Sequence, residues 1–363
     1  MIITKEQVLA ALSNVEEPDL KKDLVTLNMV EDIHIDGNKV SFSIILTTPA
    51  CPLKAMIENA CRNAILHFVS KEAEVKINMT SRVTTQTGNS LPNIKNIIAV
   101  ASGKGGVGKS TVAVNLALGL AKTGAKVGLI DADVYGPSIP IMFGLEGAKP
   151  RASQLENGKT RIEPIEKYGI KLLSIGFFTD PDQPVPWRGP MVSTAVKQLF
   201  NDADWGELDY LVVDLPPGTG DIHITITQGF PIAGAVIVTT PQKVALADAR
   251  KGIGMFLMPA INVPILGIIE NMAYFTPAEL PDNKYYIFGE GGGKKLAGQL
   301  GVPLLAQLPL VKSVSDSGDA GTPLILDDTN PVSGAFIDMA KKVAQQVAIV
   351  NARAATAQTA VTQ

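Results

Sequence analysis

One short segment constrains this chain more than any other. Residues 103–110 read GKGGVGKS, which fits the pattern G-x-x-x-x-G-K-[ST]. The apolar run IIAVA precedes the segment and the helical pattern TVAVNLALGLA follows it, so the segment joins a strand to a helix. Glycines let a backbone wrap phosphates with its N–H groups pointing inward, and the helix start adds partial positive charge. The sequence therefore predicts a phosphate-binding loop.

Each position of this loop has an expected role. Lys109 is expected to reach the β- and γ-phosphates of ATP, and Ser110 is expected to bind Mg²⁺. ATP and Mg²⁺ are thus the predicted cofactors. The expected nucleotide contacts in the loop are Gly103, Lys104, Gly105, Gly106, Val107, Gly108, Lys109, Ser110 and Thr111.

Short runs rich in Val and Ile recur after residue 96 and alternate with helical segments. Such runs are typical of parallel strands that are buried on both faces. The runs are 97–101, 127–130, 170–174, 210–213, 235–239 and 265–269. Repeated βα units predict a doubly wound, mostly parallel α/β P-loop NTPase fold, with its ligand at the carboxyl ends of the strands.

Two of these strands end in aspartates. VVDLPPGTGD (212–221) places Asp214 at a strand end, where its carboxylate is expected to hold Mg²⁺ through water. Gly218 and Gly220 permit a loop that senses the γ-phosphate. LIDADVYGPSIP (129–140) places Asp131 and Asp133 after another strand. One or both are expected near the metal and the attacking water, unless they are turn and cap residues.

The order of elements predicts four parts. Residues 1–85 read as a small α+β domain with helices near 5–13 and 53–69 and a hairpin turning at residues 36–38. A linker is expected over 86–95, where QTGNSLPN is polar and contains Gly and Pro. Residues 96–350 form the P-loop ATPase domain, and 351–363 are expected to be a flexible tail.

Composition narrows the class of protein. The 363 residues are 46% apolar and 18% charged with a net charge of −3, which suits a globular chain and gives no reason to expect nucleic-acid binding. No secretory signal and no run long enough to span a membrane is found, so no membrane partner is expected. Two cysteines fit the reducing cytoplasm, which is the expected location.

Lys104 adds a feature that a generic P-loop lacks, because it gives the string KGGVGKS. This string resembles the deviant P-loop of the MinD/ParA/ArsA class. The strings ASGKGGVGKST, DADVYGPSIP, VPWRGPM, VVDLPPGTGD, TTPQKVALADA and ENMAYF resemble the Mrp/ApbC family of iron–sulfur cluster carrier ATPases. Residues 1–85, including TTPACPLK (47–54), are similar to the PaaD-like domain that many bacterial Mrp proteins carry.

The resemblance implies a nucleotide-switched homodimer that hydrolyses ATP slowly and serves iron–sulfur apoprotein clients or scaffold proteins. Lys104 would reach across the dimer to the partner's phosphates, as an arginine finger does. Asp133 would lie beside the attacking water, Asp214 and Asp221 would belong to the second switch, and Asn271 would contact the adenine base.

The chain differs from the family in the segment that holds the iron–sulfur cluster. Family carriers place a C-x-x-C pair after ENM-x-Y, but residues 270–297 contain no cysteine. Both cysteines, Cys51 and Cys61, lie in the small domain. Cys51 follows a strand and precedes a helix, where a thiol can be exposed with a lowered pKa. An iron–sulfur or other metal role for Cys51 is one interpretation and an inert buried thiol is the other; Cys61 reads as a core residue.

Three functions remain open at this point. The first is a carrier that holds an iron–sulfur cluster, and the second is an ATPase-switched assembly adaptor that holds none. The third is a spatial organiser like MinD or ParA. The role of Arg188, in the rigid stretch VPWRGPM, is open, and isolated histidines such as His223 are not expected to bind metal.

Overall fold

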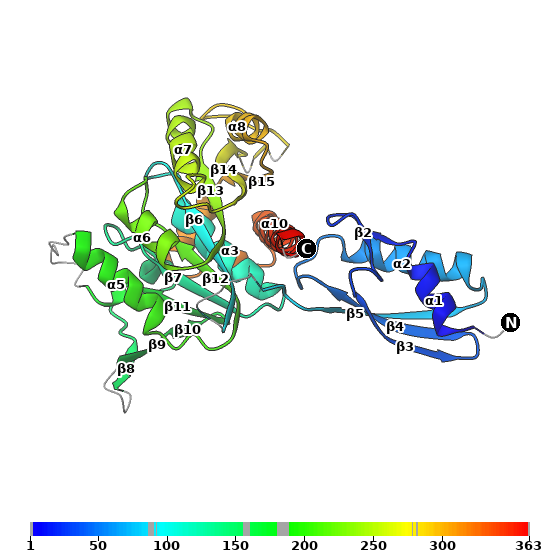
Figure 1. Ribbon diagram of the computed structural model, residues 1–363. Coiled ribbons are helices and arrows are strands. Elements are labelled where there is room, and N and C mark those ends of the chain that lie inside the picture. The colour runs from blue at the N-terminus through cyan, green and yellow to red at the C-terminus, as the bar shows by residue number, and fades with distance from the viewer. Residues whose placement is uncertain are drawn as a thin grey trace. The chain divides into compact units, whose positions relative to one another are not determined.

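The computed structural model describes residues 3–85, 91, 93–154, 160–179, 189–277, 279–280 and 282–361. The chain divides into two compact units, shown in Figure 1. One comprises Met1–Thr84 with Asn351–Gln363, and the other comprises Thr85–Val350.

The smaller unit is built from a three-stranded sheet and two helices. Helix α1 (Lys5–Leu12) begins at a capping box in which Thr4 and Gln7 satisfy each other's backbone N–H groups. Strands β3 (Val30–Asp36) and β4 (Lys39–Leu46) form the predicted hairpin. Helix α2 (Lys54–Phe68) then returns the chain to β5 (Glu74–Ser81), which pairs parallel to β4. The short strands β1 (Glu16–Glu17) and β2 (Lys22–Asp23) pair with each other in a separate antiparallel sheet.

The larger unit contains an eight-stranded sheet in the order β10-β11-β7-β12-β6-β13-β14-β15. All neighbours are parallel except β10 and β11. This confirms the predicted doubly wound α/β fold. The strands are β6 (Ile94–Ala101), β7 (Val127–Asp131), β10 (Ile165–Lys167), β11 (Ile170–Ser174), β12 (Leu208–Asp214), β13 (Ile232–Thr239), β14 (Ile265–Phe275) and β15 (Leu304–Leu310).

Helices cover both faces of this sheet (Figure 1). Apolar residues of α5 (Gly189–Asn201), α6 (Asp221–Gly229), α7 (Lys243–Phe256) and α8 (Gly292–Leu300) share one core with alternate residues of the strands. On the other face α3 (Lys109–Lys122) packs against α10 (Pro331–Val361), where a Cβ on Gly119 would lie 2.7 Å from that of Ala340. Shorter elements are α4 (Ile139–Met142), α9 (Lys312–Asp319), η1 (Ile175–Phe177), η2 (Leu324–Leu326), β8 (Arg151–Gln154) and β9 (Thr160–Glu163).

Three features differ from the expectations. Strand β6 begins at Ile94, inside the expected linker, most of which lies outside the described residues. The edge strand β15 was not predicted, because LLAQLPL is short and contains a proline. The tail expected from residue 351 is helical as far as Val361, because NARAATAQTAV is rich in the strongest helix former, alanine. None of the described helices has the length and apolar composition needed to span a bilayer.

Candidate nucleotide-binding site

Strand register gathers polar residues into a row across the carboxyl edge of the large sheet. Asp131, the last residue of β7, pairs with Ser174 on one side and with Asp214 on the other. In the other half of the sheet, Glu270 of β14 pairs with Thr239 and Gln307. The phosphate-binding loop leaves β6 between these two halves. Asp131 and Asp214, both predicted from strand ends, therefore lie side by side at the edge where the rule for parallel α/β sheets expects a ligand.

The glycines of the loop have separate steric reasons. Gly106 and Gly108 have φ values of 80° and 79°, a region that glycine enters without steric cost. A Cβ on Gly103 would lie 2.1 Å from the backbone carbon of Asp248 in α7. A Cβ on Gly108 would lie 2.2 Å from Asn271 Nδ2. The loop is thus packed closely against its neighbours on two sides.

Lys109 joins the loop to the aspartates at the strand ends. Its ammonium lies 2.7 Å from Asp214 Oδ1 and 3.5 Å from Asp133 Oδ2, and it donates to Ser110 Oγ at 3.2 Å. Lys109 and Asp214 are buried, the latter completely. A buried charge pair of this kind needs both partners, because removing one leaves an uncompensated charge that costs about 3–5 kcal/mol.

The two aspartates after β7 have different surroundings. Both carboxylate oxygens of Asp131 accept hydrogen bonds, Oδ1 from Asp133 N at 3.2 Å and Oδ2 from Ser174 Oγ at 2.9 Å and Ile139 N at 3.2 Å. Burial, and next the neighbouring Asp214 charge, raise the pKa of Asp131 to about 7. Asp131 therefore fixes the start of α4, whereas Asp133 faces Lys109. The structure separates two residues that the sequence left together.

Two carboxylate oxygens of this cluster have no hydrogen-bond partner among the described residues. They are Asp133 Oδ1 and Asp214 Oδ2, and both are buried. Burial raises the pKa of Asp214, although the Lys109 charge opposes this effect. Buried carboxylate oxygens without partners beside a serine hydroxyl fit Mg²⁺, which prefers oxygen ligands.

Lys104 and Asn271 lie in contrasting environments at the loop. Lys104 is exposed, and its ammonium has no ion-pair partner within the described part of the chain. Its carbonyl accepts a hydrogen bond from Ser102 Oγ at 3.0 Å. Asn271 is buried, and its Nδ2 donates to the carbonyl of Val107 at 2.8 Å. The adenine contact of Asn271 stays a prediction.

Glu270 lies at the edge of the site and was not predicted from the sequence. It is completely buried, and it accepts hydrogen bonds at 2.6 Å from Gly293 N at the start of α8 and from Gln307 Nε2 of β15. These bonds tie β14 to its two neighbours next to Asn271. The sequence did contain a signal for it, because Glu270 directly follows the apolar run ILGII. A charged residue buried at such a position requires hydrogen-bond partners.

The structure corrects the expectation that the Cys51 thiol has a lowered pKa. Cys51 is half-buried, and burial raises its pKa, with further raising by the charges of Glu17 and Asp19. No group of three or more His, Cys, Asp or Glu side chains within the described ranges could hold a metal ion. Cys61 is a completely buried core residue, as predicted, and burial raises its pKa to about 12. Trp187 and Arg188 lie outside the described residues.

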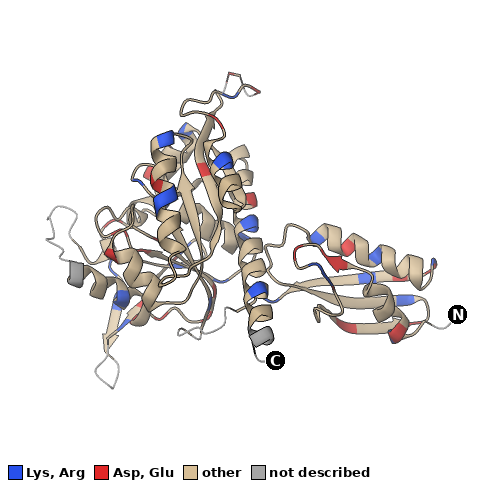
Figure 2. Ribbon diagram, turned by 45° about the horizontal axis from the view of Figure 1, so that its top comes forward, with Lys and Arg blue, Asp and Glu red and all other residues tan. Residues whose placement is uncertain are grey.

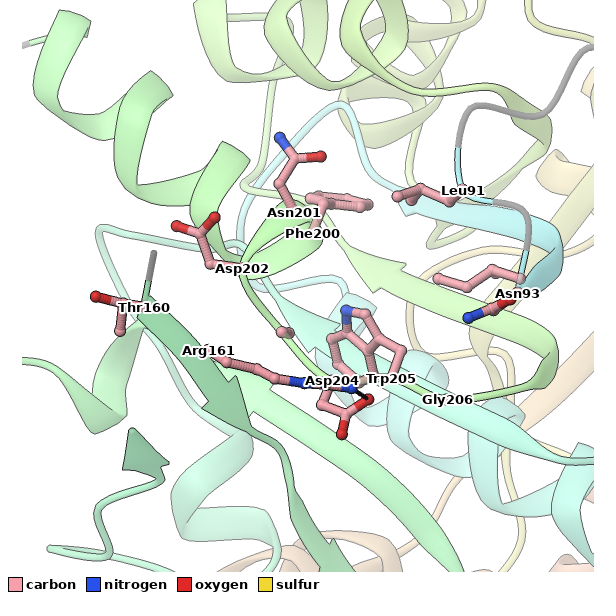
Figure 3. A pocket seen from close by; sticks show the side chains of 12 residues that line it. Leu91, Asn93, Thr160, Arg161, Phe200, Asn201, Asp202, Asp204, Trp205 and Gly206 are labelled. Atoms are coloured by element: carbon pink, nitrogen blue, oxygen red, sulfur yellow. Dashed lines mark ion pairs between the residues drawn. The ribbon is translucent and has the colours of Figure 1, made fainter. Parts of the chain in front are cut away.

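A separate cavity of about 620 Å³ opens at the opposite edge of the sheet (Figure 3). It is lined by Asn93 before β6 and by Trp205 before β12, and an ion pair joins Arg161 to Asp204 beside it. Strand β6 has eight residues, so its two ends are roughly 23 Å apart. This cavity is therefore distinct from the phosphate-binding loop.

Known proteins resemble both parts of the chain. Residues 93–345 match the family described as NUBPL iron-transfer P-loop NTPase, and residues 5–78 match the family described as iron-sulfur cluster assembly protein. The iron-sulfur cluster carrier protein of Synechocystis is 48% identical, over 96% of this chain and 99% of the relative. The chloroplastic Fe-S cluster assembly factor HCF101 of Arabidopsis thaliana is 44% identical, over 98% of this chain and 66% of the relative.

A solved structure supports the same relationship. The nucleotide-binding protein of Archaeoglobus fulgidus, in complex with ADP, is 38% identical with a TM-score of 0.56 and covers 67% of this chain and 91% of its own. The resemblance to Mrp-type P-loop ATPases with an additional N-terminal domain is thereby confirmed. This chain belongs to the NUBPL iron-transfer P-loop NTPase family.

Proposed function

We propose that this protein is a nucleotide-switched ATPase that carries iron–sulfur clusters or assists their assembly, working as a homodimer. The observation that carries the ATPase part is the buried contact of Lys109 with Asp214 and Asp133 at the end of a phosphate-binding loop. The names of its relatives support the cargo.

Nucleotide binding would exchange the partners of Lys109. In the described arrangement its ammonium neutralises Asp214 and Asp133. The β- and γ-phosphates of ATP carry more negative charge, and the loop's backbone N–H groups hold them beside the same ammonium. Lys109 would therefore turn to the phosphates, which leaves both carboxylates without their cation. This change in partners is a direct link from phosphate binding to the switch residues.

The freed oxygen atoms have distinct tasks. Ser110 Oγ and Asp214 would hold Mg²⁺, Asp214 through water, and the ion would neutralise charge on the β- and γ-phosphates. Asp133, which follows the fixed residue Asp131, would orient the attacking water from its partner-free Oδ1. Asp131 already has its hydrogen bonds and would hold this segment in place.

Exposed side chains at the carboxyl edge of the large sheet support the homodimer. Lys104 is exposed there and has no ion-pair partner in the part of the chain that the structure describes, and a second copy facing this edge would bring its Lys104 to the phosphates. Large exposed apolar side chains of the larger unit lie mostly on segments that follow carboxyl ends of strands. They are Tyr135, Ile141, Phe178, Met191, Ile224, Val244, Leu280, Tyr285, Tyr286 and Ile287, whereas Leu257 and Met258 lie at the far end of α7. Such a gathering of apolar surface is typical of an interface.

The two versions of the iron–sulfur role differ in whether this protein itself binds the cluster. A holding carrier must supply thiolates, and the only two cysteines of the chain are Cys51 and Cys61 in the smaller unit. Cys61 is completely buried, so Cys51 is the thiol that this version requires. An assembly adaptor requires no cluster ligand of its own, and the raised pKa of Cys51 favours this version.

A spatial organiser like MinD or ParA receives no physical support from the charges. Figure 2 shows Lys and Arg segments interspersed with Asp and Glu segments in the described chain. Binding to DNA or to an anionic membrane depends on a continuous basic surface, which interspersed charges do not provide.

Anaerobic reconstitution with iron and sulfide tests the cargo. A holding carrier gains cluster absorbance that Cys51→Ser abolishes, whereas an adaptor gains none but accelerates cluster transfer from a scaffold to an apoprotein in the presence of ATP. Failure of both assays would refute the iron–sulfur role. Lys109→Ala should lose nucleotide affinity in either version. Its control is Lys126→Ala, which removes an exposed lysine just before β7.

A further inference from the structure

His223 is a buried histidine that the proposed chemistry does not use. It lies in the first turn of α6, directly after the loop 215–220 that follows Asp214. Its side chain is completely buried, and its ring meets that of Phe256 on α7 edge-on, with centroids 6.4 Å apart. The ring is thus enclosed between the loop and the helix layer.

Neither ring nitrogen of His223 has a hydrogen-bond partner among the described residues. Burial lowers the pKa of His223 to about 4, and the charge of Lys109 adds to this effect. The carbonyls of Gly220 and Pro216 lie near enough to the ring to oppose it, without the geometry of a complete hydrogen bond. The ring is therefore neutral at pH 7, with one N–H donor and one acceptor. Buried polar groups are rarely left without partners in a resting structure.

The carbonyls that face the His223 ring belong to the loop 215–220, which has two anchor points and two glycines. Leu215 and Gly218 anchor the loop to β6 and the phosphate-binding loop through hydrogen bonds of 3.0 Å to Val100 O and 2.8 Å to Ser102 O. A Cβ on either Gly218 or Gly220 would meet no atom within 4 Å. There is thus open space beside the loop at these two glycines, and a shift of the loop would move the carbonyls of Pro216 and Gly220 relative to the ring.

We propose that His223 is a positioning residue for the loop 215–220. When ATP is bound, the neutral ring donates an N–H hydrogen bond to a carbonyl of this loop, and this bond holds the loop in its closed position. The inference rests on the proposed nucleotide-switched ATPase, because it assigns to His223 the regulation of that site. A histidine that only fills space would make no such bond in any nucleotide state.

Matched substitutions separate a hydrogen bond from packing. His223→Phe keeps an aromatic ring beside Phe256 but removes both nitrogens, whereas His223→Gln keeps a donor and an acceptor. We expect His223→Phe to raise the melting temperature of the nucleotide-free protein and to lower kcat roughly five- to tenfold, with KM for ATP unchanged. His223→Gln should recover most of the rate.

The control and the contrary results are specific. Phe256→Leu disturbs the same packing without touching a ring nitrogen, so it should lower the melting temperature and leave kcat near the wild-type value. A wild-type kcat in His223→Phe would overturn the proposal. Equal losses of rate and stability in His223→Phe and His223→Gln would also overturn it, because they would show that packing alone matters.

Imidazole nitrogen NMR reads the bond directly, since the chain has three histidines. Without nucleotide, the His223 ring should stay neutral between pH 5.5 and 8. A non-hydrolysable ATP analogue with Mg²⁺ should shift its ring nitrogens, and ADP should shift them less. Unchanged His223 signals at saturating analogue would refute the proposal. Absence of ATP hydrolysis in the wild type would instead refute the proposed function, and the NMR comparison distinguishes the two.

Discussion

The two halves of the polar row at the carboxyl edge differ in how their side chains are satisfied. Around Glu270, both carboxylate oxygens have partners at 2.6 Å, one in α8 and one in β15. Around Asp214, the buried groups Asp214 Oδ2, Asp133 Oδ1 and both nitrogens of His223 have none among the described residues. Both halves are buried and polar, but their carboxylates differ in hydrogen bonding; in the Glu270 half, the Thr240 hydroxyl is the group without a partner among the described residues.

This difference separates structure from function within one sheet. A buried polar group with good partners rigidifies its surroundings, whereas a buried group without them is costly unless a ligand or a movement supplies the partner. We therefore assign the Glu270 half to the frame of the site and the Asp214 half to its chemistry. Substitutions in the first half should change stability, and substitutions in the second should change turnover.

The largest expected effect is on turnover, at Lys104. Lys104→Ala should still bind ATP but hydrolyse it about 10³-fold more slowly or worse, because the partner's charge no longer reaches the transition state. Steady-state phosphate release and nucleotide titration measure the two effects separately. Lys126→Ala should hydrolyse ATP normally, and normal turnover in Lys104→Ala would remove the case for a site shared by two subunits.

Glu270→Ala should chiefly lower stability. It removes two hydrogen bonds to a buried carboxylate, so the free energy of unfolding should fall by about 3 kcal/mol in urea denaturation. Glu290→Ala, at an exposed position between β14 and α8, should change the free energy of unfolding little. If Glu270→Ala instead abolished hydrolysis at unchanged stability, the assignment of this half to the frame would be wrong.

The pH dependence of the free energy of unfolding should reveal the lowered pKa of His223. Its pKa is lowered from 6.5 to about 4 in the folded protein, so the unfolded chain binds the extra proton between these values. Stability is therefore complete above pH 6.5 and falls as the pH drops toward 4, by about 2 kcal/mol at pH 5. The change in unfolding free energy between pH 7.5 and pH 5, compared between the wild type and His223→Phe, isolates the contribution of His223. An identical pH dependence in both proteins would contradict it.

The smallest expected effect is that of Cys51→Ser. The thiol is half-buried and its pKa is raised, so the substitution should change the free energy of unfolding by about 1 kcal/mol or less and leave ATP hydrolysis unchanged. Thermal denaturation and phosphate release measure both. A large fall in hydrolysis would show that the smaller unit takes part in the ATPase cycle.

The sequence predicted the fold and the phosphate-binding loop well because both depend on local patterns. The motif at 103–110 carries its own geometry in its glycines, and the runs of Val and Ile mark buried parallel strands. It could not separate Asp131 from Asp133, because their difference depends on hydrogen bonds that only the folded chain makes, from Ser174, which is distant in sequence, and from Ile139 at the start of α4. The same limit hid Glu270 and reversed the expectation for Cys51, since burial and neighbouring charges are properties of the folded chain.

The close packing of Gly103 limits which residues can replace it in this loop. Because the place of its Cβ is already filled by the backbone of Asp248, even alanine would force α7 or the loop to move. A saturation library at this position should return glycine alone, through selection for fit between two segments of backbone. Redesign of the first motif position would therefore have to begin by remodelling the path of α7.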